Sequence, residues 1–162
     1  MNPVYIDIHI HTSSNHEEHN TRYDTRALLS GVERMAQGAE VLISLTDHNT
    51  INKVAYLALL ANASSNIHVL LGVELNIKNY KEAPSYHCHI IFDCVVNEAN
   101  IDAINDILDK LYPRKRVERA DEKLPDISQV INAFDNYDFL LLPHGGQSHA
   151  TFDHSIPQGV KF

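Results

Sequence analysis

The sequence predicts an α/β fold, because apolar strand-like runs alternate along the chain with segments whose apolar residues recur at helical spacing. Alternation of this kind is typical of parallel strands covered by helices, either in an open sheet or in a (β/α) barrel. Five strands are fewer than the eight that close a barrel of the usual kind. The strand-like runs cover residues 4–11, 41–47, 68–77, 87–96 and 139–143.

The first strand alternates Val and Ile with Asp7, His9 and His11. Because successive side chains of a strand point to opposite faces, these three ionisable groups are expected to share one face while the apolar row packs against helices. Ionisable groups on a covered strand are costly unless they bind something, and two histidines at this spacing can hold a metal ion. The alternative is an exposed edge strand with solvated histidines.

The helical segments are placed by apolar spacing and by residues suited to cap helix N-termini. A polar, charged connection at 112–125 separates the last two. Helices are expected over 25–39, from a cap at Asn49 or Thr50 through Val54, Leu57 and Leu60, over 97–111, and from a cap at Asp126 through Phe134.

Composition is that of one ordinary globular domain of 162 residues, with 44% hydrophobic and 21% charged residues. The exception is histidine, with 11 His against 13 Lys+Arg. A net charge of −8 argues against nonspecific coating of nucleic acid, although bound metal ions would reverse the potential locally. The one basic cluster, Arg114, Lys115, Arg116 and Arg119, is either a solvated segment or a contact for substrate phosphates.

Cys88 and Cys94 lie in one strand-like run, so about 20 Å separates them and a disulfide between them is excluded. A reducing compartment fits this pattern. The N-terminus has no signal-peptide pattern, and no apolar run approaches the roughly 18 residues of a membrane helix. These features predict a cytoplasmic protein without membrane partners.

Further candidate ligands stand where strands end. Asp47 and His48 close the second strand, Glu74 lies near the end of the third, and His144 follows the fifth. Ligands drawn from the carboxyl ends of successive strands are the usual construction of a barrel active site. The pattern therefore predicts a metal site.

The motifs resemble those of PHP (polymerase and histidinol phosphatase) domain phosphoesterases, in family order from Asp7 to about Gly146. The resemblance implies a distorted (β/α)7 TIM-like barrel, truncated at the C-terminus in this chain, with residues 1–162 as a single PHP domain. It is carried by Asp7-Ile8-His9-Ile10-His11-Thr12, Thr46-Asp47-His48-Asn49, Gly72-Val73-Glu74, His89-Ile90-Ile91 and Pro143-His144-Gly145.

The resemblance also implies a site of up to three divalent metal ions, of zinc, manganese or iron. Asp7 and Asp47 are its candidates for orienting ligands or shuttling protons. In this assignment His9 and His11 hold the first metal, His16 and His48 the second, and Glu74 bridges the first and third metals, which His89 and His144 complete.

Several alternatives stay open at the remaining histidines. His87 shares a face with His89 and is its rival as a ligand, and His19 or Glu17 can replace His16. A structural role is expected for His68, whereas the spacing assigns none to His149 or His154.

The departure from the family is at the C-terminus, where no Asp-x-His follows His144. We therefore expect the chain to be the N-terminal part of a longer protein. The Pro-His-Gly-Gly run at 143–146 is similar to PHP domains fused to ATPase modules, which makes such a module a possible partner.

The expected activity is metal-dependent hydrolysis of phosphoesters, with a phosphorylated small molecule or a nucleic acid as substrate and a metal-activated water as nucleophile. One rival is an amidohydrolase-like enzyme that cleaves C–N bonds, in which a lysine would bridge the metals. A second rival is a non-catalytic PHP module that binds metal within a larger ATPase or nucleic-acid-processing protein.

Overall fold

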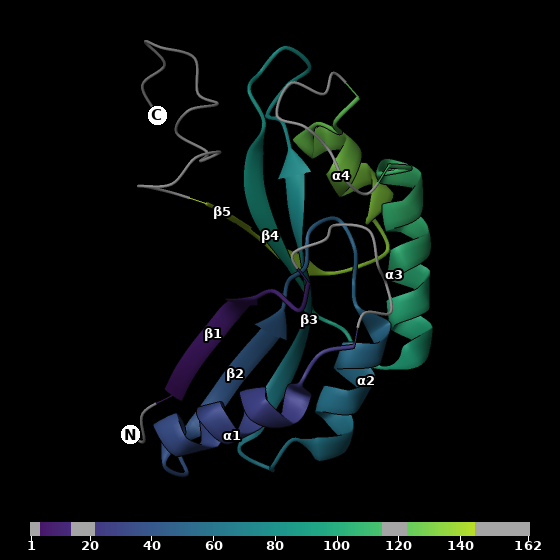
Figure 1. Ribbon diagram of the computed structural model, residues 1–162. Coiled ribbons are helices and arrows are strands. Elements are labelled where there is room, and N and C mark those ends of the chain that lie inside the picture. Colours follow the sequence, from purple (N-terminus) through teal and green to yellow (C-terminus); the bar gives the residue numbers. More distant parts are fainter. Residues whose placement is uncertain (1–3, 14–21, 115–122, 145–162) are drawn as a thin grey trace.

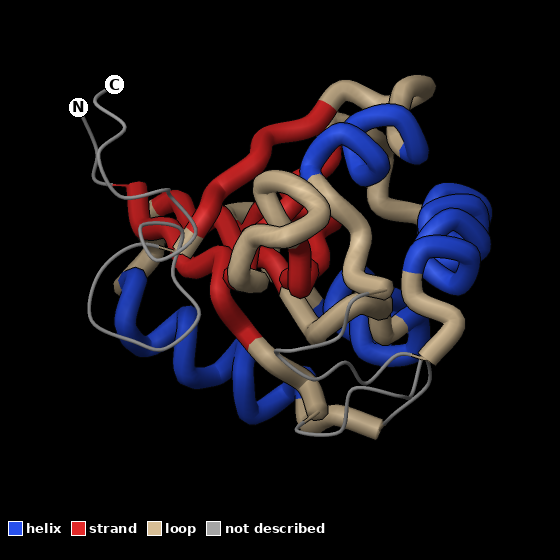
Figure 2. The backbone as a smooth tube through the Cα atoms, turned by 90° about the horizontal axis from the view of Figure 1, so that it is seen from above, coloured by secondary structure: helices blue, strands red, loops and turns tan. Residues whose placement is uncertain are grey.

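The computed structural model describes residues 4–13, 22–114 and 123–144, which form a curled five-stranded sheet and four helices (Figure 1). The helices lie around the outer side of the sheet (Figure 2). The strands are β1 (Val4–Ile10), β2 (Glu40–Leu45), β3 (Ile67–Ile77), β4 (Tyr86–Phe92) and β5 (Phe139–Pro143). The helices are α1 (Thr25–Ala36), α2 (Lys53–Asn62), α3 (Glu98–Leu111) and α4 (Ile127–Ala133).

The sheet is mixed, and the expectation of a truncated (β/α)7 TIM-like barrel is wrong. Its order is β1-β2-β3-β4-β5, with β1, β2 and β3 parallel and the pairs β3–β4 and β4–β5 antiparallel. Only residues 78–85 connect β3 to β4. A parallel crossover needs a dozen or more residues, so this short connection makes an antiparallel pair. The strand–helix alternation therefore fails at the third connection.

The core lies between the helices and the outer face of the sheet. Alternate side chains of β2 and β3 are almost fully buried there, beside Leu29 and Val32 of α1 and Ile101 and Ile104 of α3. Each such side chain stabilises the fold by about 1.5–3 kcal/mol relative to leaving it in water. The buried residues of the two strands are Val41, Ile43, Leu45, Leu71, Val73, Leu75 and Ile77.

Side-chain caps begin each helix. Asp24 and Asn97 cap α1 and α3, and Asp126 forms a reciprocal capping box with Gln129 in α4, as its sequence position predicts. The cap of α2 is Asn52, so the prediction of Asn49 or Thr50 is wrong. Asn49 instead adopts a left-handed backbone conformation (φ 56°) and bonds to β3.

The first strand is an edge strand, and the prediction that helices cover it is wrong. Val4 and Ile6 are 54% and 64% exposed, and at the opposite edge Leu140 of β5 is 65% exposed. Although β1 and β5 are the two outermost strands, the rings of His9 and His144 lie 4.8 Å apart. The sheet therefore curls until its two edges approach each other where the histidines lie.

No helix among the described residues is long and apolar enough to span a membrane, in agreement with the sequence. Cys88 and Cys94 are both free thiols, which confirms the expected absence of a disulfide between them.

Candidate metal centre

Glu74 of β3 is the centre of the histidine cluster. It is fully buried, and the sheet places a histidine on each side of it. His48 forms a parallel β-bridge with Glu74, and His89 of β4 pairs with it in antiparallel register. Backbone bonds from Glu74 N–H to the Asp47 carbonyl (3.0 Å) and from Asn49 N–H to the Glu74 carbonyl (2.8 Å) fix the loop after β2 against the strand.

Six imidazoles surround the Glu74 carboxylate. Its Oε1 lies 2.7 Å from His87 Nδ1 and 3.6 Å from His144 Nε2. Its Oε2 lies 3.4 Å from His9 Nε2, 3.1 Å from His11 Nε2, 3.7 Å from His48 Nδ1 and 3.9 Å from His89 Nε2.

The Glu74 carboxylate fits a metal ligand because its hydrogen-bonding capacity is unmet. Both oxygens are inaccessible to water, and neither has hydrogen-bond geometry with a described residue despite the close imidazoles. A buried carboxylate without hydrogen bonds is costly. Imidazole nitrogens and carboxylate oxygens are ligand atoms that zinc, manganese and iron accept. Divalent ions bound here would therefore satisfy the Glu74 carboxylate and the imidazoles around it at the same time.

Two groups of potential ligands share Glu74. One consists of His9, Glu74, His89 and His144, and the other of His11, His48 and Glu74. In each group the donor atoms lie within 4.8 Å of one another. Two ligands about 2.1 Å from a common metal lie about 3–4 Å apart, so small side-chain shifts suffice. Each group could hold a metal ion, and Glu74 belongs to both groups.

A β-bulge decides which residues of β1 face the cluster. Asp7 pairs with Ile43 and Ile10 pairs with Leu45, so two residues of β1 oppose one of β2 between these pairs. Ile43 and Leu45 point toward the helices. Ile10 and Asp7 therefore share that side, whereas His9 and His11 face Glu74. The prediction that Asp7 shares a face with the histidines is wrong, because the extra residue reverses the alternation.

Asp7 and Asp47 consequently occupy different surroundings. Asp7 is exposed, and its carboxylate accepts the His9 backbone N–H at 3.3 Å. Asp47 is buried, and its Oδ1 accepts the backbone N–H groups of Thr12 (2.6 Å) and Ser13 (3.1 Å). Its Oδ2 accepts the Thr12 hydroxyl. Asp47 thus holds the turn that follows His11, and it belongs to neither ligand group among the described residues.

Burial and the shared carboxylate shift the pKa values of the cluster in opposite directions. Burial lowers the pKa of His144 to about 4 and also lowers that of His9, whereas the close contact with the Glu74 carboxylate raises the pKa of His11. Burial alone would raise the pKa of Glu74, but the imidazoles of His11, His87 and His89 outweigh it and hold this pKa well below its usual value. Glu74 is therefore anionic, and His9 and His144 are neutral, at pH 7.

The structure brings together six of the seven predicted metal ligands, namely His9, His11, His48, Glu74, His89 and His144. The seventh, His16, lies outside the described residues, as do Glu17, His19, His149 and His154. A third metal involving His16 therefore stays a prediction. The ligand groups pair His9 with His89 and His144, a different division from the assignment of His9 and His11 to one metal.

His87 is the cluster residue that the sequence ranked second to His89. Its Nδ1 is the nitrogen nearest to Glu74, yet it belongs to neither ligand group. The His144 backbone N–H donates to the His87 carbonyl at 2.9 Å, which ties the end of β5 to β4. In the sequence, the only indication that His87 lies in the cluster is its spacing of two residues from His89, which places both side chains on one face of the strand. His68 is exposed, pairs with Glu40 and belongs to neither ligand group, and the structural role expected for it stays a prediction.

The comparisons with known proteins add no relative. The sequence matches no protein-family model, and a search of curated proteins finds no match for it. The resemblance to PHP domains therefore rests on the motifs alone.

Proposed function

We propose that the protein is a metal-dependent hydrolase of phosphoesters. The observation that carries this proposal is the buried Glu74 carboxylate, shared by two groups of ligands and surrounded by six imidazoles. Burying a carboxylate without hydrogen bonds among so many donor nitrogens costs free energy unless metal ions occupy the site. The PHP-like motifs point to phosphoesters as the substrate class.

Bound divalent ions would supply a water of lowered pKa and positive charge for the phosphoryl oxygens. The residues of the chain prepare the site for them. Glu74 is anionic, and His9 and His144 are neutral, which is the protonation state that ligands need. Asp47 orients His11 through the Thr12–Ser13 turn. The two ligand groups meet at one carboxylate, that of Glu74.

His87 suits a proton-transfer role in this site. It stands beside Glu74 without belonging to either ligand group, and its ring is 23% exposed. An imidazole in such a position can pass a proton between the leaving group and solvent.

The test begins with metal content. Purified protein is stripped with a chelator, loaded with zinc or manganese, and analysed for bound metal. Hydrolysis of an aryl phosphate and of a DNA oligonucleotide is then measured with and without metal. We expect two metals per chain from the described ligands, and phosphate or nucleotide release that depends on them.

His9→Ala is the test variant and His68→Ala its matched control, since the control removes an exposed histidine paired with Glu40 outside the cluster. His9→Ala is expected to lose metal and activity, and His68→Ala to keep both. Protein that stays metal-free after loading would overturn the proposal. Metal-loaded protein that cleaves C–N bonds and no phosphoester would identify the amidohydrolase-like alternative. Metal-loaded protein that hydrolyses neither phosphoesters nor C–N bonds would identify the other alternative, a non-catalytic module that binds metal.

A further inference from the structure

Strand β3 continues past the end of β2, and the loop after β2 pairs with it again at Glu74. The strand β2 ends at Leu45, and beyond it His48 forms an isolated parallel bridge with Glu74. Glu74 N–H donates to the Asp47 carbonyl at 3.0 Å, and Asn49 N–H donates to the Glu74 carbonyl at 2.8 Å. These two backbone bonds come from the residues on either side of His48, so they determine where this candidate ligand stands relative to Glu74.

The side chain of Asn49 continues the ladder of bonds where its backbone cannot. In a continuing parallel pair, the next bond would join the Asn76 N–H to the backbone carbonyl of Asn49. Asn49 has a φ of 56°, which lies outside the range of a β-strand. Its side-chain oxygen replaces that carbonyl, because Oδ1 accepts the Asn76 N–H at 3.0 Å. Two backbone bonds and one side-chain bond therefore follow one another across the bridge between His48 and Glu74.

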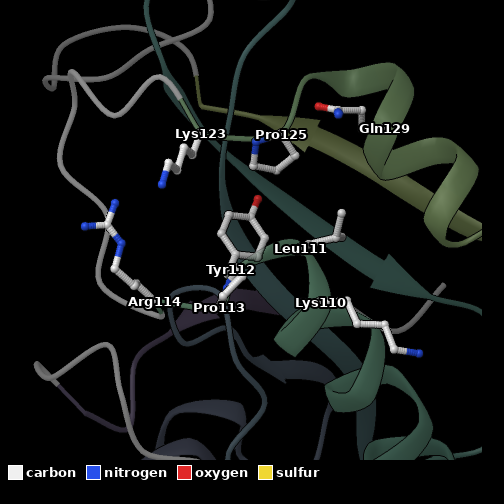
Figure 3. A pocket seen from close by; sticks show the side chains of 8 residues that line it. All are labelled: Lys110, Leu111, Tyr112, Pro113, Arg114, Lys123, Pro125 and Gln129. Carbon is white, nitrogen blue, oxygen red and sulfur yellow. The ribbon is translucent and has the colours of Figure 1, made fainter.

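Asn76 is also held from the helical side of the molecule. Its carbonyl accepts the hydroxyl of Tyr112 at 2.8 Å. Tyr112 follows α3, and its ring stands among the residues that line a pocket there (Figure 3). Buried backbone groups need hydrogen-bond partners, and both backbone groups of Asn76 receive theirs from side chains. Asn49 supplies the partner that belongs to the loop carrying a candidate ligand.

Asparagine suits position 49 because it meets two requirements at once. Glycine adopts a positive φ readily, and asparagine does so more often than most other residues. Glycine has no acceptor atom to offer Asn76, whereas the asparagine side chain carries one close to its backbone. Asn49 is 1% exposed, so the charge of an aspartate in its place would be buried at a cost.

We propose that Asn49 is a positioning residue, which holds His48 beside Glu74 through the bond of its side chain to Asn76. His48 Nδ1 lies 3.7 Å from Glu74 Oε2. Two ligands of one metal ion lie about 3–4 Å apart, so the separation is already suited to a shared ion. The consequence for metal binding rests on the proposed function, whereas the hold on the loop exists without metal.

The first measurement is amide hydrogen exchange by NMR on the full chain after metal removal. Asn49→Gly keeps the left-handed conformation accessible and removes the side chain. The Asn76 amide should then exchange about tenfold faster, because it loses one hydrogen bond. The Val41 amide, which donates to the Asn66 carbonyl at the start of β2, should keep its rate. Unchanged exchange at Asn76, or equal acceleration at Val41, would overturn the inference.

The second measurement is calorimetric titration with zinc in two backgrounds. His144→Ala retains the ligand group that contains His48, and His11→Ala retains the other group. Asn49→Gly should lower zinc affinity about 10–100-fold in the first background and leave it nearly unchanged in the second, because residues that support a ligand act on that ligand's metal. Asn97→Gly is the matched control, since it removes a side chain that accepts a backbone N–H at the start of α3, and it should change neither affinity.

The two measurements separate this inference from the proposed function. Equal losses of zinc affinity in both backgrounds, or a loss in the control as large as in Asn49→Gly, would contradict a role specific to His48. Wild-type protein that binds no zinc would overturn the proposed function, and the exchange rates of Asn76 and Val41 would then decide the inference by themselves.

Discussion

Glu74 and Leu75 are neighbours on β3, and both are fully buried. Their side chains point to opposite sides of the sheet, and burial has a different energetic consequence for each of them. Leu75 points into the helix-covered core, where it belongs to the cluster of buried apolar side chains. Glu74 points to the inner side of the curl, where its oxygens have imidazoles around them and no hydrogen bond. Burial on the outer side stabilises the protein by itself. If the proposed metal centre is right, burial on the inner side becomes favourable when metal ions bind.

The two faces also differ in how they are assembled. The outer face is covered by helices that lie next to their strands in the sequence, such as α1 against β2. The inner face joins β1 to β5, at opposite ends of the described chain. The outer core should therefore govern stability, and the inner cluster should govern binding. Four substitutions or conditions test that division.

The largest effect is expected from Glu74→Ala. Both ligand groups lose their shared member, and removing one member of a buried charged set costs about 3–5 kcal/mol, or roughly 1,000-fold in affinity. Calorimetric titration of the Glu74→Ala variant with zinc should show binding at neither ligand group. Glu82→Ala, which removes an exposed carboxylate outside both groups, is the control and should bind as the wild type does. Two intact sites in Glu74→Ala would contradict the proposed centre.

Leu75→Ala tests the outer face. It should lower the free energy of unfolding by about 2–5 kcal/mol, because it leaves a cavity among fully buried side chains. Urea unfolding of the metal-free protein measures this loss. Leu140→Ala, at a 65% exposed position, should change it by less than about 0.5 kcal/mol. The metal stoichiometry of the folded Leu75→Ala protein should stay unchanged, and its loss would show that the two faces are coupled.

Asp47→Asn tests whether a residue outside the ligand groups positions His11. An amide offers one acceptor oxygen where the carboxylate uses two for Thr12 and Ser13, so the turn after His11 loosens. We expect zinc affinity to fall by about 10–100-fold at one of two sites, as for other residues that support metal ligands. Asp7→Asn is the matched control on the far side of the bulge. If Asp7→Asn weakens binding as much, the assignment of faces in β1 is wrong.

The smallest effect is a difference in pH dependence between two single-site variants. His11→Ala retains the group with His144, whose pKa is about 4, and His144→Ala retains the group with His11, whose pKa is raised. A proton bound to a ligand must leave before metal binds, so the group with the higher pKa loses affinity first as pH falls. Between pH 7.5 and 5.5, zinc affinity should therefore decline more in His144→Ala than in His11→Ala. The reverse order would contradict the assigned shifts.

Much of the local structure could be predicted from the sequence, because it depends on neighbouring residues. The helices over α1, α3 and α4 follow from apolar spacing and capping residues, and β5 has the predicted bounds. Among the six described candidate ligands, His9 and His11 were recognisable from the alternation of the first strand. His48, Glu74 and His144 were recognisable from their places near strand ends, and His89 from the family resemblance. The short 78–85 connection also contained the information that β4 is antiparallel to β3, although the alternating pattern favoured a barrel.

Other features had no local signal. The bulge in β1 separates Asp7 from His9 and His11, and a strict alternation of residue types hides it. The role of Asp47 depends on Thr12 and Ser13, more than thirty positions earlier in the chain. The edge position of β1 depends on which strands pair, and an alternating apolar row reads the same at an edge as in the centre of a sheet.

By itself, the sequence determined most of the elements and the candidate ligands, because helix caps, apolar periodicity and donor chemistry are properties of short segments. The tertiary structure alone decided how those ligands combine. The curl of the sheet brings β1 against β5, and the strand register places His48 and His89 beside Glu74. Long-range pairing and curvature arise from packing the whole outer face, so the shared carboxylate at the centre is a consequence of the fold.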